Sequence, residues 1–156
     1  MNSLKAFGVD KNKGRHYEEG IYSLALIYNI INNEISSYLQ PFNLTPGKLN
    51  ILMTIKHQGK DHGISQVEVS KHLIVTPSNM TKLIDKLEKE KLATRSALAG
   101  DRRVNIIRIT ARGSQLLNEV WPDYTAKLKT LYAVLDNEKQ KMLSMLLLDW
   151  FERLRK

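Results

Sequence analysis

The sequence predicts a mainly α fold with a small β-wing, in which a winged helix-turn-helix is flanked by long N- and C-terminal helices. Three observations support this prediction. Apolar residues recur at helical spacing near both ends, two short helical patterns lie close together in the middle, and two strand patterns enclose a glycine-containing tip. We expect a single domain, 1–156, with dimerisation helices at 16–40 and 114–156 and the winged helix-turn-helix at 45–112.

Composition narrows the class of protein. The formal net charge is +8, which favours an anionic partner, nucleic acid before an acidic membrane surface. The chain has no cysteine, which excludes disulfides, thiolate nucleophiles and thiol-based redox sensing. No stretch approaches the roughly 18 uninterrupted apolar residues of a membrane-spanning helix, and the N-terminus lacks the apolar core of a signal peptide. We therefore expect a cytoplasmic protein without a membrane partner.

The first long helical pattern runs from His16 to Leu39. Its apolar residues recur at alternating intervals of four and three, which is heptad spacing. Further apolar residues lie off this stripe, so the helix has to bury more than one face. A helix packed only on its own core is the alternative, but the length of the stripe favours a subunit interface. The stripe consists of Tyr17, Ile21, Leu24, Tyr28, Ile31, Ile35 and Tyr38.

Capping signals divide the middle of the chain into short helices. Thr45-Pro46 and Thr76-Pro77 each place a capping side chain before a proline at the first helical position. Ser65 and Glu68 form a capping box just after Ile64, for which we expect a short strand. These signals predict a buried helix after Thr45 and then the two motif helices, which are joined by a turn at 73–75.

The second motif helix is amphipathic. Met80, Leu83, Ile84 and Leu87 share the face that should pack on the first motif helix. The opposite face has residue types that form hydrogen bonds with bases and phosphates, although an ordinary solvated face remains the alternative. That face comprises Ser78, Asn79, Thr81, Lys82, Asp85, Lys86 and Lys89.

Two strands, 93–97 and 104–109, are expected after this helix, with a tip at 98–103 that contains paired arginines. Positive charge is concentrated here. From Thr76 to Arg112, nine lysines and arginines face four acidic residues, which is +5 of the total +8. A merely solvated face does not account for this concentration, so the segment is a candidate DNA-binding surface.

Two helices complete the expected fold. Thr110 should cap a long apolar helix that Pro122 is expected to bend, and Asp136 should begin the last helix. The last helix has apolar residues at helical spacing, among them Leu146 and Trp150. One small winged helix cannot cover all these apolar faces. We therefore expect Tyr17, Ile21, Leu24, Leu146 and Trp150 to lie in a dimer interface.

From about residue 16 onward the chain resembles the MarR family of bacterial winged-helix regulators. The resemblance rests on SQVEVSKHL at 65–73, VTPSNMTKLIDKLEKEKL at 75–92, Gly100-Asp101-Arg102-Arg103 in the wing and ITARG at 109–113. Lys91 departs from the family pattern, which usually has glycine at this position after the second motif helix. A lysine here must adopt the left-handed backbone conformation, or the helix must end differently.

The resemblance implies a homodimer whose second motif helix enters the major groove of double-stranded DNA while the wing reaches the minor groove. By position, Thr76, Ser78, Asn79, Thr81 and Lys82 would face bases or phosphates and Lys86 the backbone. Arg102 or Arg103 would enter the minor groove, with Asp101 bracing the wing arginine.

The expected function is a transcriptional regulator, a repressor before an activator, that binds a pseudo-palindromic operator as a homodimer. A small-molecule effector is left open, and its pocket residues are unknown. We expect no cofactor and no metal site, because His57 and His62 lie in a loop that is more simply solvated. The alternatives are a winged-helix protein-interaction module without DNA binding, or an enzyme, for which the sequence offers no catalytic motif.

Overall fold

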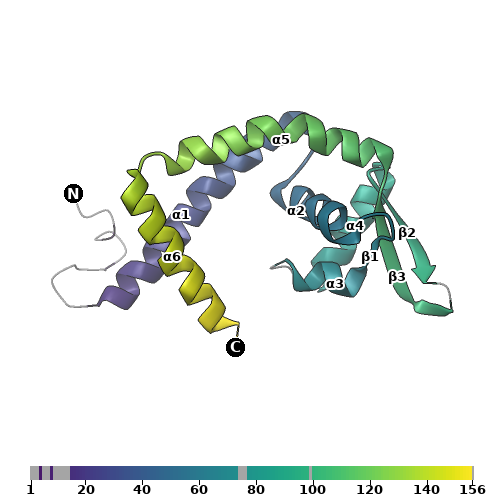
Figure 1. Cartoon of the computed structure of the whole chain (residues 1–156), viewed down its shortest axis with the longest axis horizontal. Coiled ribbons are helices and arrows are strands. Elements are labelled where there is room, and N and C mark those ends of the chain that lie inside the picture. The colour runs from purple at the N-terminus through teal and green to yellow at the C-terminus, as the bar shows by residue number, and fades with distance from the viewer. Residues whose placement is uncertain (1–3, 5–7, 9–14, 74–76, 99, 156) are drawn as a thin grey trace. The chain divides into compact units, whose positions relative to one another are not determined.

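The computed structural model describes residues 4, 8, 15–73, 77–98 and 100–155, with the side chains of Pro77, Ser78 and Arg102 left out. The chain forms two compact units, Met1–Leu117 and Asn118–Lys156. It is mainly helical, with one three-stranded antiparallel sheet in the order β1-β3-β2 (Figure 1). This confirms the predicted fold class.

The elements follow the expected order. The first unit contains α1 (His16–Leu39), η3 (Gln40–Phe42), α2 (Pro46–Thr54), a single π-helical turn η4 (Ile55–Gly59), β1 (Ile64–Ser65), α3 (Gln66–Lys71), α4 (Pro77–Lys89), β2 (Ala93–Leu98) and β3 (Asp101–Ile109). Helix α5 (Ala111–Tyr132) begins in this unit and ends in the second, which also contains α6 (Asn137–Leu154).

The core of the first unit lies between α2, α3, α4 and the sheet. The predicted inner face of α4 is confirmed, since Met80, Ile84 and Leu87 are buried and Leu83 is half-buried. The predicted burial of α2 is also confirmed, because Leu49, Ile51 and Leu52 are fully buried, as is Ile55 just after it. These contacts hold α4 against the rest of the unit and leave its other face outside.

Side-chain caps define where the short helices begin. The Thr45 hydroxyl accepts a hydrogen bond from the Lys48 backbone N–H at 3.3 Å, and the Ser65 hydroxyl accepts one from the Glu68 N–H at 3.1 Å. Both caps were predicted. Helix α4 begins at Pro77, as the proline signal indicated, while residues 74–75 of the predicted turn and the predicted cap Thr76 lie outside the described residues.

The wing differs from the prediction in its strand lengths. The strands were expected at 93–97 and 104–109, but β2 extends to Leu98 and β3 begins at Asp101. The tip of the wing is therefore much shorter than the predicted 98–103. Leu98 pairs with Asp101 after a register shift beyond Ala97, and Gly100 has a φ of +88°. A bulge together with a glycine at positive φ allows the hairpin to close tightly.

A compact junction joins α4, β2 and α5. Lys91 takes the left-handed conformation, with a φ of 60°, which confirms one of the two options for this departure from the family pattern. The Thr110 hydroxyl donates to the Lys91 carbonyl at 2.8 Å and accepts from the Gly113 N–H at 3.0 Å, so it also caps α5 as predicted. A Cβ on Gly113 would lie 2.2 Å from the Leu92 carbonyl oxygen, so only glycine fits at this position.

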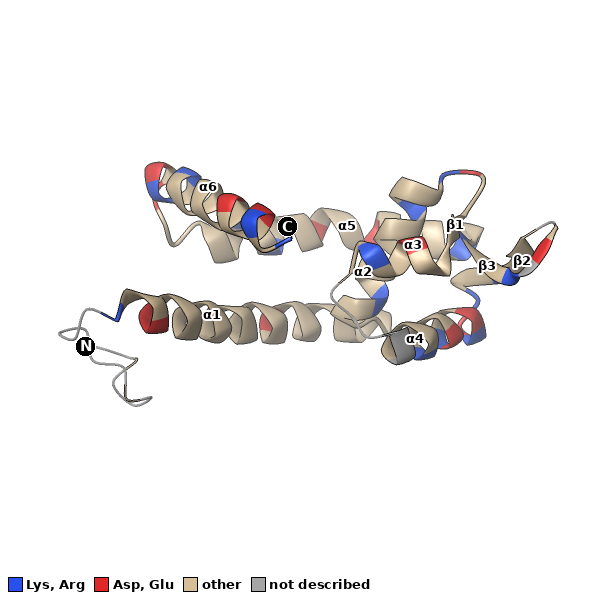
Figure 2. Cartoon of the chain, turned by 90° about the horizontal axis from the view of Figure 1, so that it is seen from below, with Lys and Arg blue, Asp and Glu red and all other residues tan. Residues whose placement is uncertain are grey.

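Helix α1 is buried only at its C-terminal end. Ile35 and Leu39 are buried, whereas Tyr17 is 70% exposed and most of the predicted stripe is likewise exposed. Figure 2 shows α1 as a long rod without lysine or arginine. The helix therefore presents an apolar surface that its own unit does not cover.

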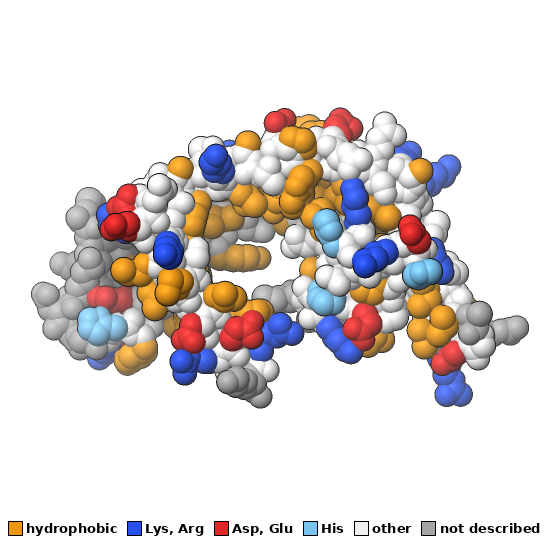
Figure 3. Space-filling view, viewed as in Figure 1, with side chains coloured by type: hydrophobic (Ala, Val, Ile, Leu, Met, Phe, Trp, Pro, Cys, Tyr) orange, Lys and Arg blue, Asp and Glu red, His pale blue; other side chains and the backbone are white. Residues whose placement is uncertain are grey.

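The second unit is a helical hairpin formed by the end of α5 and by α6. Helix α5 continues through Pro122, and the Asp136 carboxylate caps α6 by accepting from the Lys139 N–H at 2.9 Å. The Tyr132 hydroxyl donates to the Gln140 carbonyl at 3.0 Å. Figure 3 shows hydrophobic side chains over α6. On this helix Leu146 is 63% exposed.

Candidate nucleic-acid interface

The outer face of α4 carries exposed polar side chains from one end of the helix to the other. Asn79, Lys82, Lys86 and Lys89 are all exposed there, and Figure 2 shows basic positions along α4 in blue. Because the inner face of this helix is locked into the core, these residues have a fixed direction relative to the rest of the unit. The helix can therefore present hydrogen-bond donors and positive charge to an external, anionic partner.

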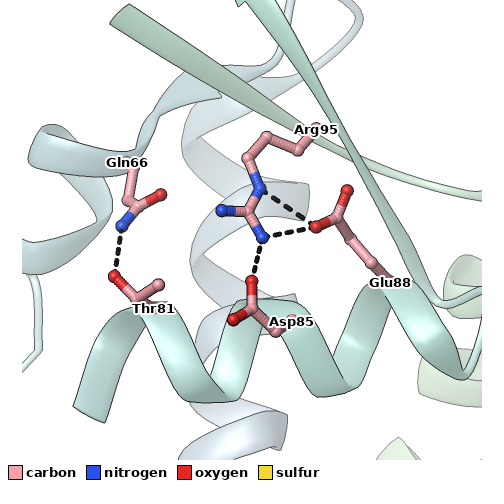
Figure 4. A network of polar contacts seen from close by, with 5 residues as sticks. All are labelled: Gln66, Thr81, Asp85, Glu88 and Arg95. Atoms are coloured by element: carbon pink, nitrogen blue, oxygen red, sulfur yellow. Dashed lines mark hydrogen bonds and ion pairs between the residues drawn. The ribbon is translucent and has the colours of Figure 1, made fainter. Parts of the chain in front are cut away.

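Thr81 is less exposed than the other polar residues that were predicted on this face and are described by the structure. Its side chain is half-buried, and its hydroxyl accepts a hydrogen bond from the Gln66 amide nitrogen at 3.0 Å (Figure 4). This contact joins α3 to α4. The sequence predicted a residue facing bases or phosphates here, and the structure adds a second role as part of the helix-turn-helix framework.

Arg95 on β2 connects the wing to α4 through two carboxylates (Figure 4). Its Nε donates to the Glu88 carboxylate at 3.0 Å, and one terminal nitrogen pairs with both Glu88 and Asp85. The Arg95 side chain is only 21% exposed. The hydrogen bonds and charges of Asp85 and Glu88 hold the pKa of Arg95 above its ordinary value, with the Asp85 hydrogen bond the largest cause and burial opposing it. Arg95 therefore stays charged, and sequence patterns had not singled it out for this role.

The tip of the wing is organised by Asp101. Its carboxylate accepts a hydrogen bond from the backbone N–H of Arg103 at 2.9 Å, and the Arg103 side chain is exposed. Behind the tip, Arg108 on β3 donates to the Ser96 hydroxyl on β2 at 2.8 Å. The wing thus presents Arg103 at the end of a hairpin that is tied across both strands.

An open groove of about 840 Å³ lies beside the C-terminal end of α4. At this groove Lys48, which is 5% exposed, pairs with Glu90 at 2.5 Å and donates to the Asn43 carbonyl at 2.9 Å. Sequence reasoning missed this buried lysine because α2 was expected to bury apolar side chains. The groove is lined by Ser36, Ser37, Gln40, Asn43, Leu44, Thr45, Lys48, Lys86, Lys89 and Glu90.

The structure places the predicted DNA-binding and wing residues that it describes on two elements, α4 and β3. Helix α4 holds Asn79, Thr81, Lys82 and Lys86 along one stretch, and the hairpin carries Asp101 and Arg103. Thr76 lies outside the described residues, as do the side chains of Ser78 and Arg102. The predicted dimer residues are exposed within their own units: Tyr17, Ile21 and Leu24 on α1, and Leu146 and Trp150 on α6.

Comparison with known proteins identifies the family. Residues 44–104 match the model of the MarR family. The HTH-type transcriptional regulator MhqR of Bacillus subtilis is 30% identical over 124 residues, which cover 80% of this chain and 83% of the relative. The chain belongs to the MarR family. The HTH-type transcriptional repressor YetL of Bacillus subtilis is also 30% identical, over 132 residues, which cover 85% of this chain and 78% of that protein.

Solved structures share the fold of this MarR-family protein. The Staphylococcus aureus MepR–DNA complex matches with a TM-score of 0.77 at 22% identity and covers 85% of this chain and 96% of that one. Rhodococcus jostii CouR bound to p-coumaroyl-CoA matches with a TM-score of 0.69 at 20% identity, over 81% of this chain and 87% of that one.

Two further properties concern the residues that the structure describes in this MarR-family protein. None of the helices there is long and apolar enough to cross a membrane. Within the same residues, no group of three or more histidine, aspartate or glutamate side chains is placed to hold a metal ion.

Proposed function

We propose that this MarR-family regulator binds a pseudo-palindromic operator in double-stranded DNA as a homodimer and represses transcription. The observation that supports this most directly is the outer face of α4, where three exposed lysines and Asn79 project from a helix locked into the core. A helix in this setting fits the major groove, and the hairpin with Arg103 fits the neighbouring minor groove.

The exposed apolar side chains support the homodimer. Tyr17, Tyr28 and Ile30 on α1 are more than half exposed, as are Leu146 and Leu154 on α6. Contiguous apolar surfaces of this kind mark protein–protein contacts. A two-fold dimer would bury both helices and place two copies of α4 about one helical turn of DNA apart, to match the two half-sites of the operator.

The relatives support repression and a small-molecule effector. YetL is named a transcriptional repressor, the MepR structure holds DNA, and the CouR structure holds p-coumaroyl-CoA. We propose that a ligand of this chain favours a dimer whose α4 helices have the wrong spacing for the operator. Such a ligand can release DNA by no more than its differential affinity for the two states.

The first experiment measures binding to the DNA upstream of the protein's own gene at several salt concentrations, against unrelated DNA of equal length. We expect selective binding to the upstream DNA. The logarithm of the binding constant should fall with the logarithm of the salt concentration, with a slope of about −0.9 for each phosphate that the protein neutralises. Arg103→Ala should weaken binding and, because the homodimer loses one cation from each subunit, reduce the magnitude of the overall salt slope by about 2, and Arg102→Ala tests the neighbouring wing arginine. Arg153→Ala on α6 is the matched control and should bind as the wild type does.

The second experiment tests the dimer by sedimentation. Ile31→Asp should dissociate it, because a carboxylate cannot be buried without a partner. Asn33→Asp adds the same charge to an exposed position of α1 and should leave the dimer intact. A folded and still dimeric Ile31→Asp variant would refute the role of the stripe.

The rival function is a protein-interaction module without DNA binding. It predicts equally weak, salt-sensitive binding to every DNA and no sequence enriched by selection from random DNA. The concentration of +5 of the net charge between Thr76 and Arg112 argues against it.

A further inference from the structure

We propose that Arg95 is a positioning residue for DNA binding, which controls affinity without touching DNA by holding the carboxylates of Asp85 and Glu88 away from the phosphates. The inference rests on the proposed function, because it concerns how α4 approaches DNA. The relevant side chains are drawn in Figure 4.

The first step is geometric. Asp85 and Glu88 lie three residues apart on α4, so they are neighbours on one side of the helix. Arg95 comes from β2, and its guanidinium reaches both carboxylates at once. The planar fork of arginine suits such multiple contacts, whereas a lysine would offer a single point charge. The carboxylates are therefore turned toward the wing strand rather than left to swing over the outer face.

The second step is electrostatic. Helix α4 carries Lys82, Lys86 and Lys89 but also the two carboxylates, so most of its positive charge is cancelled on the helix itself. Arg95 pairs with both carboxylates, and its positive charge offsets part of their negative charge. Without it, two negative charges would stand beside the DNA phosphates, and like charges brought together at an interface oppose binding.

The third step separates this role from ordinary structural support. The Asp85 side chain is 56% exposed and that of Glu88 is 32% exposed, so solvent screens both carboxylates even though Arg95 itself is only 21% exposed, and these ion pairs add only modestly to folding stability. The body of α4 is held independently by Met80, Ile84 and Leu87 in the core and by the Gln66–Thr81 hydrogen bond. Loss of Arg95 should therefore harm DNA binding far more than it harms the fold.

The experiment compares four forms of the full-length protein on one selected operator: wild type, Arg95→Met, the double variant Asp85→Asn/Glu88→Gln, and the triple variant that combines all three changes. Arg95→Met should bind at least about tenfold more weakly, because the two carboxylates are then unpaired. The triple variant should return to within about threefold of the wild type, since it lacks the carboxylates that Arg95 holds. The double variant should bind at least as tightly as the wild type.

Thermal unfolding and sedimentation accompany each binding curve. If Arg95→Met does not fold, the triple variant still tests the proposal. Its three uncharged side chains have volumes similar to those of the ion-pair network that they replace, and such a replacement is commonly tolerated. Unchanged affinity in Arg95→Met, or a folded triple variant that stays more than about tenfold weaker than the wild type, would overturn the proposal. Wild-type protein without selective DNA binding would instead refute the proposed function, and this inference with it.

Discussion

Replacing Lys91 by glycine should stabilise the protein. Lys91 has a φ of 60° between the end of α4 and the start of β2, and its side chain is exposed. An L-residue in the left-handed region is crowded by its own Cβ, whereas glycine is not. The change removes this crowding and loses no buried contact, because the interactions of the junction use the Lys91 backbone.

Two opposing terms set the size of the effect. Relief of the left-handed conformation is worth roughly 1–2 kcal/mol. The extra freedom of glycine in the unfolded chain costs about 0.5–1 kcal/mol. The free energy of unfolding should therefore rise by roughly 0–1.5 kcal/mol, with a central value of about 0.75 kcal/mol, which for a chain of this length raises the Tm by about 2–3 °C.

The assay is thermal and urea unfolding followed by circular dichroism, with all variants at one protein concentration because dimerisation shifts the Tm. Lys86→Gly is the matched control: it makes the same chemical change at an exposed position inside α4. There, glycine should lower the free energy of unfolding by roughly 0.5–1 kcal/mol. If both variants lose stability by similar amounts, the left-handed strain at Lys91 is refuted.

Three further predictions concern other contacts. Gly113→Ala should be strongly destabilising in the same unfolding assay, because its Cβ would meet a backbone carbonyl oxygen at 2.2 Å. Lys48→Met should cost about 1–3 kcal/mol by leaving Glu90 unpaired, and adding Glu90→Met should recover most of the loss; a double variant no better than the single one would refute the pairing. The Lys139 side-chain and backbone hydrogen bonds hold the pKa of Asp136 below its ordinary value of 3.8, so its stabilising contribution is present above that pH and lost as pH falls through the lowered pKa. The stability gap between wild type and Asp136→Ala, measured by unfolding at a series of pH values, should therefore narrow in acid; a constant gap would contradict this.

Local chemistry made much of the fold predictable. Thr45, Ser65, Thr110 and Asp136 all cap helices as expected, because a hydroxyl or carboxylate just before a helical pattern reaches an N–H only three residues away. The inner face of α4 was predictable for the same reason, since the spacing of its apolar residues fixes which side of the helix they share.

Pairings between distant elements required the tertiary structure. The bond between Lys48 and Glu90 joins residues 42 positions apart, and Arg95 meets Asp85 and Glu88 only because β2 returns beside α4. The bulge near Leu98 likewise depends on how two strands align. Spacing along a chain reveals neighbours within one helix or strand, whereas contacts between elements depend on how their packed faces bring them together. The sequence alone therefore determined the helices, their caps and the basic character of the surface, and only the tertiary structure decided which charges on that surface are paired and which face outward.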